Sequence, residues 1–182
     1  MKFSLKILLW MIAVMALALG FSGFYLVNFV FETSLEREVG QALDESSILS
    51  FAFETAALSV PSKYSVMPDS TVEEIASNLE SGGKDSRRRV RISDEGKHVL
   101  YVSDGFETDF TILTQTSETV KAYQVISAGE KYYIHTGVSV NALGRVLYLE
   151  TMRDVTEVFS ERSVGFSLYR RVTLVRLLSG AA

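Results

Sequence analysis

The sequence predicts an α+β domain joined to one membrane-spanning helix. Three observations predict it: an apolar run near the N-terminus, a following stretch with apolar residues at helical spacing, and later short segments in which apolar and polar residues alternate. The chain has 182 residues, which suits one globular domain with attachments. Helical patterns followed by a series of strand patterns favour an antiparallel sheet with segregated helices.

Composition excludes several classes of protein. The chain carries 18 basic and 22 acidic residues, a formal net charge of -4, so we expect no nucleic-acid partner. Cysteine is absent, so disulfides, thiolate metal sites and a nucleophilic thiol are all ruled out. We expect no metal and no cofactor.

The apolar run covers residues 7–31, with Tyr25 as its one ionisable side chain. It exceeds the roughly 20 residues that a helix needs to cross the hydrocarbon core of a bilayer. Lys2 and Lys6 precede the run and acidic residues follow it. The positive-inside tendency therefore places residues 1–6 in the cytoplasm and the later chain outside the cell membrane.

A cleaved signal peptide is the alternative interpretation of this run. Ala16-Leu17-Ala18 has the small-residue pattern of a cleavage site. Apolar cores that are cleaved usually span about 7–15 residues, and this run continues well past Ala18. We therefore favour an uncleaved anchor.

A long helix is predicted to continue from the membrane segment without a break, over residues 32–60. Its apolar stripe either packs against the domain's own sheet or forms a parallel dimer seam, and both remain open because different faces can serve each role. A second helix is predicted over residues 69–80, with candidate N-caps at its start and Gly82-Gly83 at its end. The stripe consists of Leu35, Val39, Ala42, Leu43, Ile48, Leu49, Ala52 and Ala56.

About five antiparallel strands are predicted after these helices, because the apolar period changes to two and turn signals separate the segments. Residues 106–115 are ambiguous between a loop, a short helix and a strand. The predicted strands cover residues 87–93, 99–102, 120–127, 131–140 and 145–152.

The last part of the chain, residues 154–182, returns to helical spacing. It becomes more apolar from Val172, although Arg176 interrupts it. We expect an exit helix and the start of a truncated second membrane segment.

Three stretches carry a resemblance to a known family: Met1–Lys6, Phe31–Glu38 and Tyr148–Val158. They resemble the N-terminal sensor region of bacterial two-component sensor histidine kinases. The resemblance implies an extracytoplasmic PAS-like (Cache-type) sensor domain over residues 32–153, acting in signal transduction as a homodimer. A longer parent would be a protein histidine kinase. This chain contains neither the phosphoacceptor motif nor the nucleotide-binding boxes of the kinase core, so we expect no enzymatic activity of its own.

The candidate ligand-binding residues lie on the predicted strands. On residues 131–140, Tyr133, His135 and Ser139 share the more polar face, and Tyr123 lies on the preceding strand. The alternative is a solvated sheet face. His135 could also make the domain respond to acidity.

Two charged groups are interpreted as ordinary surface. Arg87-Arg88-Arg89 with Arg91 is typical of a solvated strand edge, and its alternative is an anion or lipid-headgroup site. The loose acidic group lacks the spacing of a calcium loop, so solvated turns are favoured. This group consists of Asp94, Glu95, Asp104, Glu107 and Asp109.

The sequence thus predicts a signal-sensing region anchored in the membrane, which would bind an unknown extracellular ligand or protein and pass the stimulus through its flanking helices. The alternative is an anchored protein-interaction module without a small-molecule ligand. An extracellular enzyme is disfavoured because no grouped nucleophile, base and orienting residue is recognisable.

Overall fold

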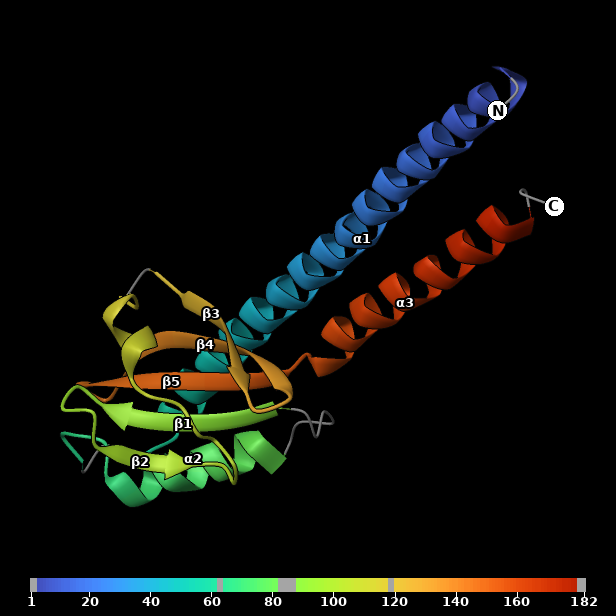
Figure 1. The fold of residues 1–182 in the computed structure, drawn as a ribbon. Coiled ribbons are helices and arrows are strands. Elements are labelled where there is room, and N and C mark those ends of the chain that lie inside the picture. The colour runs from blue at the N-terminus through green and yellow to red at the C-terminus, as the bar shows by residue number, and fades with distance from the viewer. Residues whose placement is uncertain (1–2, 62–63, 82–87, 118–119, 180–182) are drawn as a thin grey trace. The chain divides into compact units, whose positions relative to one another are not determined.

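The computed structural model describes residues 3–61, 64–81, 88–117 and 120–179. Within them the predicted order of two helices, five antiparallel strands and a C-terminal helix is confirmed (Figure 1). The predicted helix stop at Gly82-Gly83, together with Lys2 and Arg87, lies outside the described residues. In chain order the elements are α1 (Phe3–Ala57), α2 (Asp69–Ser81), β1 (Arg88–Asp94), β2 (Val99–Val102), the 3-10 helix η1 (Thr111–Thr114), β3 (Ala122–Ala128), β4 (Lys131–Ala142), β5 (Arg145–Asp154) and α3 (Thr156–Ser179).

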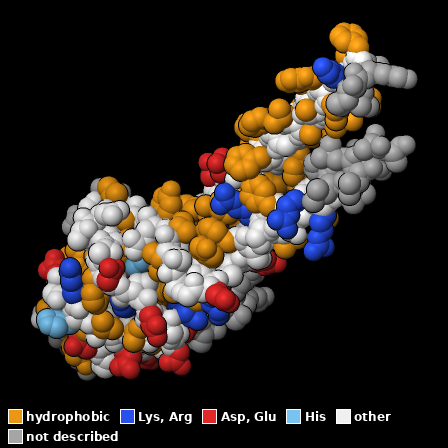
Figure 2. All heavy atoms as spheres, in the orientation of Figure 1, with side chains coloured by type: hydrophobic (Ala, Val, Ile, Leu, Met, Phe, Trp, Pro, Cys, Tyr) orange, Lys and Arg blue, Asp and Glu red, His pale blue; other side chains and the backbone are white. Residues whose placement is uncertain are grey.

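The chain divides into two compact units. One contains α1 as far as Glu36 and α3 from Glu157, and the other contains residues 37–156. α1 is a single uninterrupted helix, which confirms that the predicted juxtamembrane helix continues the apolar run. Its length and composition allow it to cross a membrane, and apolar side chains cover its N-terminal part (Figure 2).

The sheet has the strand order β2-β1-β5-β4-β3, with every pair antiparallel. β4 and β5 pair as far as Ala142 and Arg145, so the hairpin turn is two residues long, shorter than the predicted turn over residues 141–144. Leu143 and Gly144 both have positive φ, 47° and 71°, as a type I′ turn requires. This turn matches the twist of the two strands it joins.

One face of the sheet forms the apolar core with α1 and α2. α1 contributes positions that recur every three or four residues, among them Leu49, Phe53 and Ala57. Ile48 and Phe51 point the other way and are exposed. The predicted stripe of α1 is therefore divided between two faces. The buried core residues are Leu49, Phe53, Ala57, Met67, Val72, Ala76, Val90, Ile92, Val138, Val140, Ala142, Leu147 and Leu149.

The opposite face of the sheet is covered by residues 103–117, which we name the strap. The strap begins with two hydrogen bonds to β1: Ser103 N–H donates to the Val90 carbonyl, and Val90 N–H donates to Ser103 Oγ, both at 2.8 Å. η1 lies in the strap and places Ile112 in the interior. A Cβ at Gly137 of β4 would lie 2.9 Å from Thr116 Oγ1, so glycine allows the strap to approach the sheet. The ambiguous segment 106–115 is thus irregular chain with a short 3-10 helix.

Tyr101 of β2 generates a prediction about pH. Its hydroxyl donates to the carboxylate of Glu80 on α2. Burial, and then this hydrogen bond, raises the pKa of Tyr101 to about 12. Between pH of about 10 and about 12 an unfolded chain loses this proton while the folded chain keeps it, so the free energy of unfolding falls across that window.

We expect the difference in phenolate absorbance between the full chain and Tyr101→Phe to titrate with a midpoint near pH 12 in the folded state. In denaturant the same difference titrates near pH 10, the ordinary value for a tyrosine. A folded-state midpoint near 10 contradicts the packing of Tyr101 against α2.

Candidate functional site

A buried cluster of charged and polar side chains lies on the sheet face under the strap. Its members come from neighbouring strands, with Arg91 on β1, Glu150 on β5 and His135 on β4. Arg91 and Glu150 stand directly opposite each other in the β1–β5 register. Arg91 donates from Nε to Glu150 Oε2 at 2.7 Å and from Nη2 to Oε1 at 2.6 Å. This is the two-pronged geometry in which a guanidinium binds a carboxylate most strongly.

His135 extends the cluster toward the edge of the sheet. Its Nε2 lies 3.0 Å from Glu150 Oε1, and its Nδ1 lies 3.0 Å from the side-chain amide nitrogen of Gln124 on β3. An amide that donates to Nδ1 leaves Nε2 as the nitrogen that donates to the carboxylate. His135 and Glu150 are both 0% exposed, so the polar groups of β1, β5, β4 and β3 are joined without water access to these two side chains.

Arg91 also holds the strap. Its Nη1 donates to the Thr108 carbonyl at 2.7 Å, and its Nη2 donates to the Asp109 carbonyl at 2.9 Å. The guanidinium carbon lies 4.1 Å from the ring centroid of Phe110 and 4.8 Å from that of Phe106. Cation–π contacts of this kind stabilise a desolvated cation. One arginine therefore connects the strap to the centre of the sheet.

The direction of the Asp109 carbonyl is fixed by a local turn. The exposed Asp109 carboxylate accepts hydrogen bonds from the Thr111 hydroxyl at 2.5 Å and the Thr111 N–H at 3.2 Å. The hydroxyl bond, followed by the backbone bond, lowers the pKa of Asp109. The turn starts η1, so the carbonyl that Arg91 binds belongs to an ordered segment.

Two hydroxyls near the cluster are buried without a hydrogen-bond partner. They are Ser93 Oγ, two positions along β1 from Arg91, and Thr108 Oγ1, in the strap. A buried polar group without a partner costs about 1–3 kcal/mol. These two hydroxyls therefore contribute unfavourably to the packing between the strap and the sheet.

Three of the four predicted ligand-binding residues share the face under the strap, and the fourth does not. Tyr133 and His135 are buried there, and Ser139 is half-buried. Tyr123 stands opposite Thr136 in the β3–β4 register, so its side chain lies on the other face, where it is 49% exposed. Tyr123 therefore does not lie with the other three candidates, because direct cross-strand partners share a face and the β3–β4 turn sets the register. The alternative of a solvated face is wrong for Tyr133 and His135.

The arginine run is not a solvated strand edge, because β1 lies between β2 and β5. Arg88 donates to Glu45 of α1 at 2.7 Å, and Arg89 donates to the Gly105 carbonyl at 2.6 Å. Arg91 is buried in the cluster. Each arginine of this run in the described chain thus has a partner within the domain.

Two residues of the predicted acidic group, Asp94 and Asp109, accept hydrogen bonds within turns. Asp94 Oδ1 accepts the His98 N–H at 2.9 Å in the β1–β2 turn, and this bond lowers the pKa of Asp94. In the part of the chain that the structure describes, no three histidine, aspartate or glutamate side chains gather so that they could hold a metal ion.

Sequence reasoning missed Arg91, Glu150 and Gln124 as members of the site. A signal was present: all three residues lie on predicted strands, where alternation assigns each side chain to one face of the sheet. From the sequence, the face of Arg91 is expected to be solvated, because charged side chains are usually exposed. The strap's aromatic residues could not be assigned to it, since their segment has no regular period.

No protein-family model matches this chain, and no curated protein matches it. Any function assigned to the chain therefore depends on the geometry of the buried cluster and of the helices.

Glu150→Gln tests the cluster. The substitution keeps the shape of the side chain and leaves Arg91 buried without a countercharge, so we expect the free energy of unfolding to fall by about 3–5 kcal/mol. Denaturation of the full chain in detergent, followed by near-ultraviolet circular dichroism, measures the change.

Asp69→Asn is the matched control, because the exposed Asp69 pairs with Arg145 at the surface and its loss costs about 0–1 kcal/mol. Equal losses in the two variants would show that the buried pair does not hold the domain together.

Proposed function

We propose that this chain is the extracytoplasmic signal-sensing region of a membrane histidine kinase, with its N-terminus in the cytoplasm. The observation that carries the proposal is the double role of α1. The helix contributes Leu49, Phe53 and Ala57 to the core of the sheet domain and continues, unbroken, into an apolar segment long enough to cross a membrane. A change in the sheet domain therefore has a direct covalent route to the membrane.

The finer fold proposal is a PAS-like, Cache-type domain. A five-stranded antiparallel sheet with a long N-terminal helix on one face supports it. The strap on the other face supplies the cover under which a stimulus would act, and Tyr133, His135 and Ser139 are the ligand-binding residues that remain candidates beneath it.

The strap is the element that a stimulus would bias. In its closed arrangement Arg91 donates to Glu150 and to two strap carbonyls, while Ser93 and Thr108 keep hydroxyls without partners. A polar ligand or a partner protein that supplied those partners would favour a released strap. Its differential affinity for the two arrangements would set the size of the response.

The route from the strap to α1 runs through β1 and β5. These strands hold Arg91 and Glu150 on one face, and near one end they carry the cross-strand pair Arg88 and Arg153. Arg88 binds Glu45 of α1 at 2.7 Å, and Arg153 lies 3.2 Å from Glu45 and 3.2 Å from Glu38. The two strands that respond to the strap are therefore also ion-paired to α1.

An anchored interaction module is the second candidate function. The observation that favours it is an exposed apolar face formed by Ile48 and Phe51 of α1 and by Leu58, which directly follows the helix. These positions share one side of the helix, and Phe51 is 70% exposed. Such a face is typical of a protein contact.

A chimera of this chain with the second membrane helix and cytoplasmic core of a well-characterised sensor kinase, read out with its reporter gene, tests the sensing proposal. Phe110→Leu weakens the contact of the strap with Arg91, so we expect reporter output to shift about fivefold, the change that about 1 kcal/mol produces in a two-state equilibrium. Tyr123→Leu is the control, because it removes an exposed aromatic from the other face. Unchanged output in both variants would favour the interaction module.

The exposed face of α1 is also where we propose that two copies meet. Anchored copies share orientation and height, so the same faces can oppose each other in a two-fold contact. The chain has no cysteine of its own, so any disulfide between copies must come from a cysteine that is introduced by substitution. We expect Ile48→Cys in membranes to form disulfide-linked dimers under mild oxidation and Glu73→Cys, exposed on α2, to form few. Equal cross-linking at both positions would contradict a dimer through this face.

A further inference from the structure

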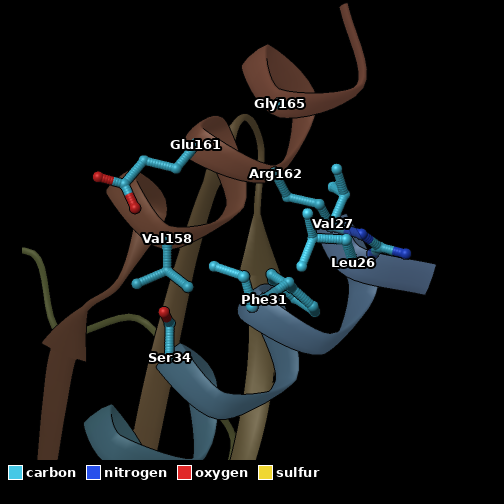
Figure 3. A pocket seen from close by; sticks show the side chains of 9 residues that line it. Leu26, Val27, Phe31, Ser34, Val158, Glu161, Arg162 and Gly165 are labelled. Carbon is cyan, nitrogen blue, oxygen red and sulfur yellow. The ribbon is translucent and has the colours of Figure 1, made fainter. Parts of the chain in front are cut away.

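A small groove lies between α1 and α3 within the unit that these two helices form (Figure 3). Its volume is about 210 Å³. Its apolar lining comes from Leu26, Val27, Val30 and Phe31 of α1 and from Val158 and Gly165 of α3.

The two helices are in close contact on both sides of the groove. The rings of Phe31 and Phe159 meet edge to face with centroids 5.1 Å apart. Farther along, the backbone of Gly23 lies against the ring of Tyr169, and a Cβ at this position would overlap the ring as it stands. The groove is therefore a space between two helices that pack against each other through aromatic side chains.

Arg162 is the cation of this groove. Its Nη2 donates to Asn28 Oδ1 at 2.9 Å, and its guanidinium carbon lies 4.5 Å from the centroid of the Phe31 ring. Its Nε is buried and has no hydrogen-bond partner. Among the described residues no carboxylate pairs with it, and the neighbouring Glu161 points away from it in Figure 3.

The contact of Arg162 with Phe31 of α1 places its guanidinium at the border of the membrane. Phe31 is the last residue of the apolar run, so a guanidinium on its ring lies where the hydrocarbon of a bilayer ends and the phosphate groups begin. An arginine without a carboxylate partner at this height needs an anion, and a guanidinium binds phosphate oxygens well. The apolar lining of the groove beside it is complementary to a hydrocarbon chain.

We propose that the groove binds part of one acyl chain of a phospholipid and that Arg162 binds the phosphate of the same lipid. A second copy of this chain fits less well, because a two-fold contact here would bring two Arg162 side chains together. The groove is also too small for a helix about 10 Å across. The proposal depends on α1 crossing a membrane and not on the kinase-sensor function, so either can fail without the other.

Native mass spectrometry of the full chain, stripped of lipid in mild detergent, tests the proposal with two probes that have the same acyl chains: dioleoylphosphatidylglycerol and dioleoylglycerol. We expect one phosphatidylglycerol per chain and about tenfold weaker binding of dioleoylglycerol, which lacks the phosphate. Arg162→Gln should weaken phosphatidylglycerol binding about tenfold, equivalent to about 1.4 kcal/mol. Inorganic phosphate at millimolar concentration should not displace the lipid.

Arg170→Gln is the matched control, since Arg170 is exposed on α3 outside the groove, and it should bind like the unsubstituted chain. Val30→Phe fills the groove while keeping Arg162, and it should also lose the lipid. Helix content measured by circular dichroism confirms that each variant is folded. Equal binding of the two probes, binding unchanged by Arg162→Gln, or a lipid-free dimer that excludes the probe would each overturn the proposal.

Discussion

The salt bridge between Arg91 and Glu150 is the interaction on which the sheet domain depends. Removing two charges from water is expensive, and their attraction compensates only when the geometry is good and the remaining donors are used. Here the guanidinium binds both carboxylate oxygens and two strap carbonyls, and His135 binds the same carboxylate. The pair therefore joins β1 to β5, β5 to β4, and the strap to the middle of the sheet.

The two faces of the sheet consequently have different physical characters. The face under α1 and α2 is held by apolar side chains such as Phe53 and Ile92, whose packing is non-directional and tolerates small shifts. The face under the strap combines the directional bonds of Arg91 with two smaller apolar clusters, one around Phe106 and one around Ile112. The fold thus combines an extensive apolar core on one face of the sheet with a smaller, partly polar contact under the strap on the other.

Much of this arrangement follows from local patterns, and the rest depends on contacts between distant segments. The long helix, the second helix, the strands and their turns were predicted from periods of 3.6 and 2 and from turn residues. The neighbours of a strand are not encoded in its own period, which is why Arg91 was expected at an edge and lies in the interior. Likewise, the sequence could not show that Tyr123 and Tyr133 lie on opposite faces, because the register of β3 against β4 is set by the pairing of the strands and not by either strand alone. The strap has no period, so its aromatic contacts with Arg91 could not be read from the sequence.

The position of the cluster also explains how so small a site could act on a long helix. Arg91 and Arg88 lie on one strand, and Glu150 and Arg153 lie on its neighbour, so the two arginines that bind α1 are rigidly connected to the pair that binds the strap. Their partners on α1, Glu38, Gln41 and Glu45, recur every three or four residues and so share one side of the helix. A small displacement of β1 relative to β5 would change these distances together and apply its force to one side of α1.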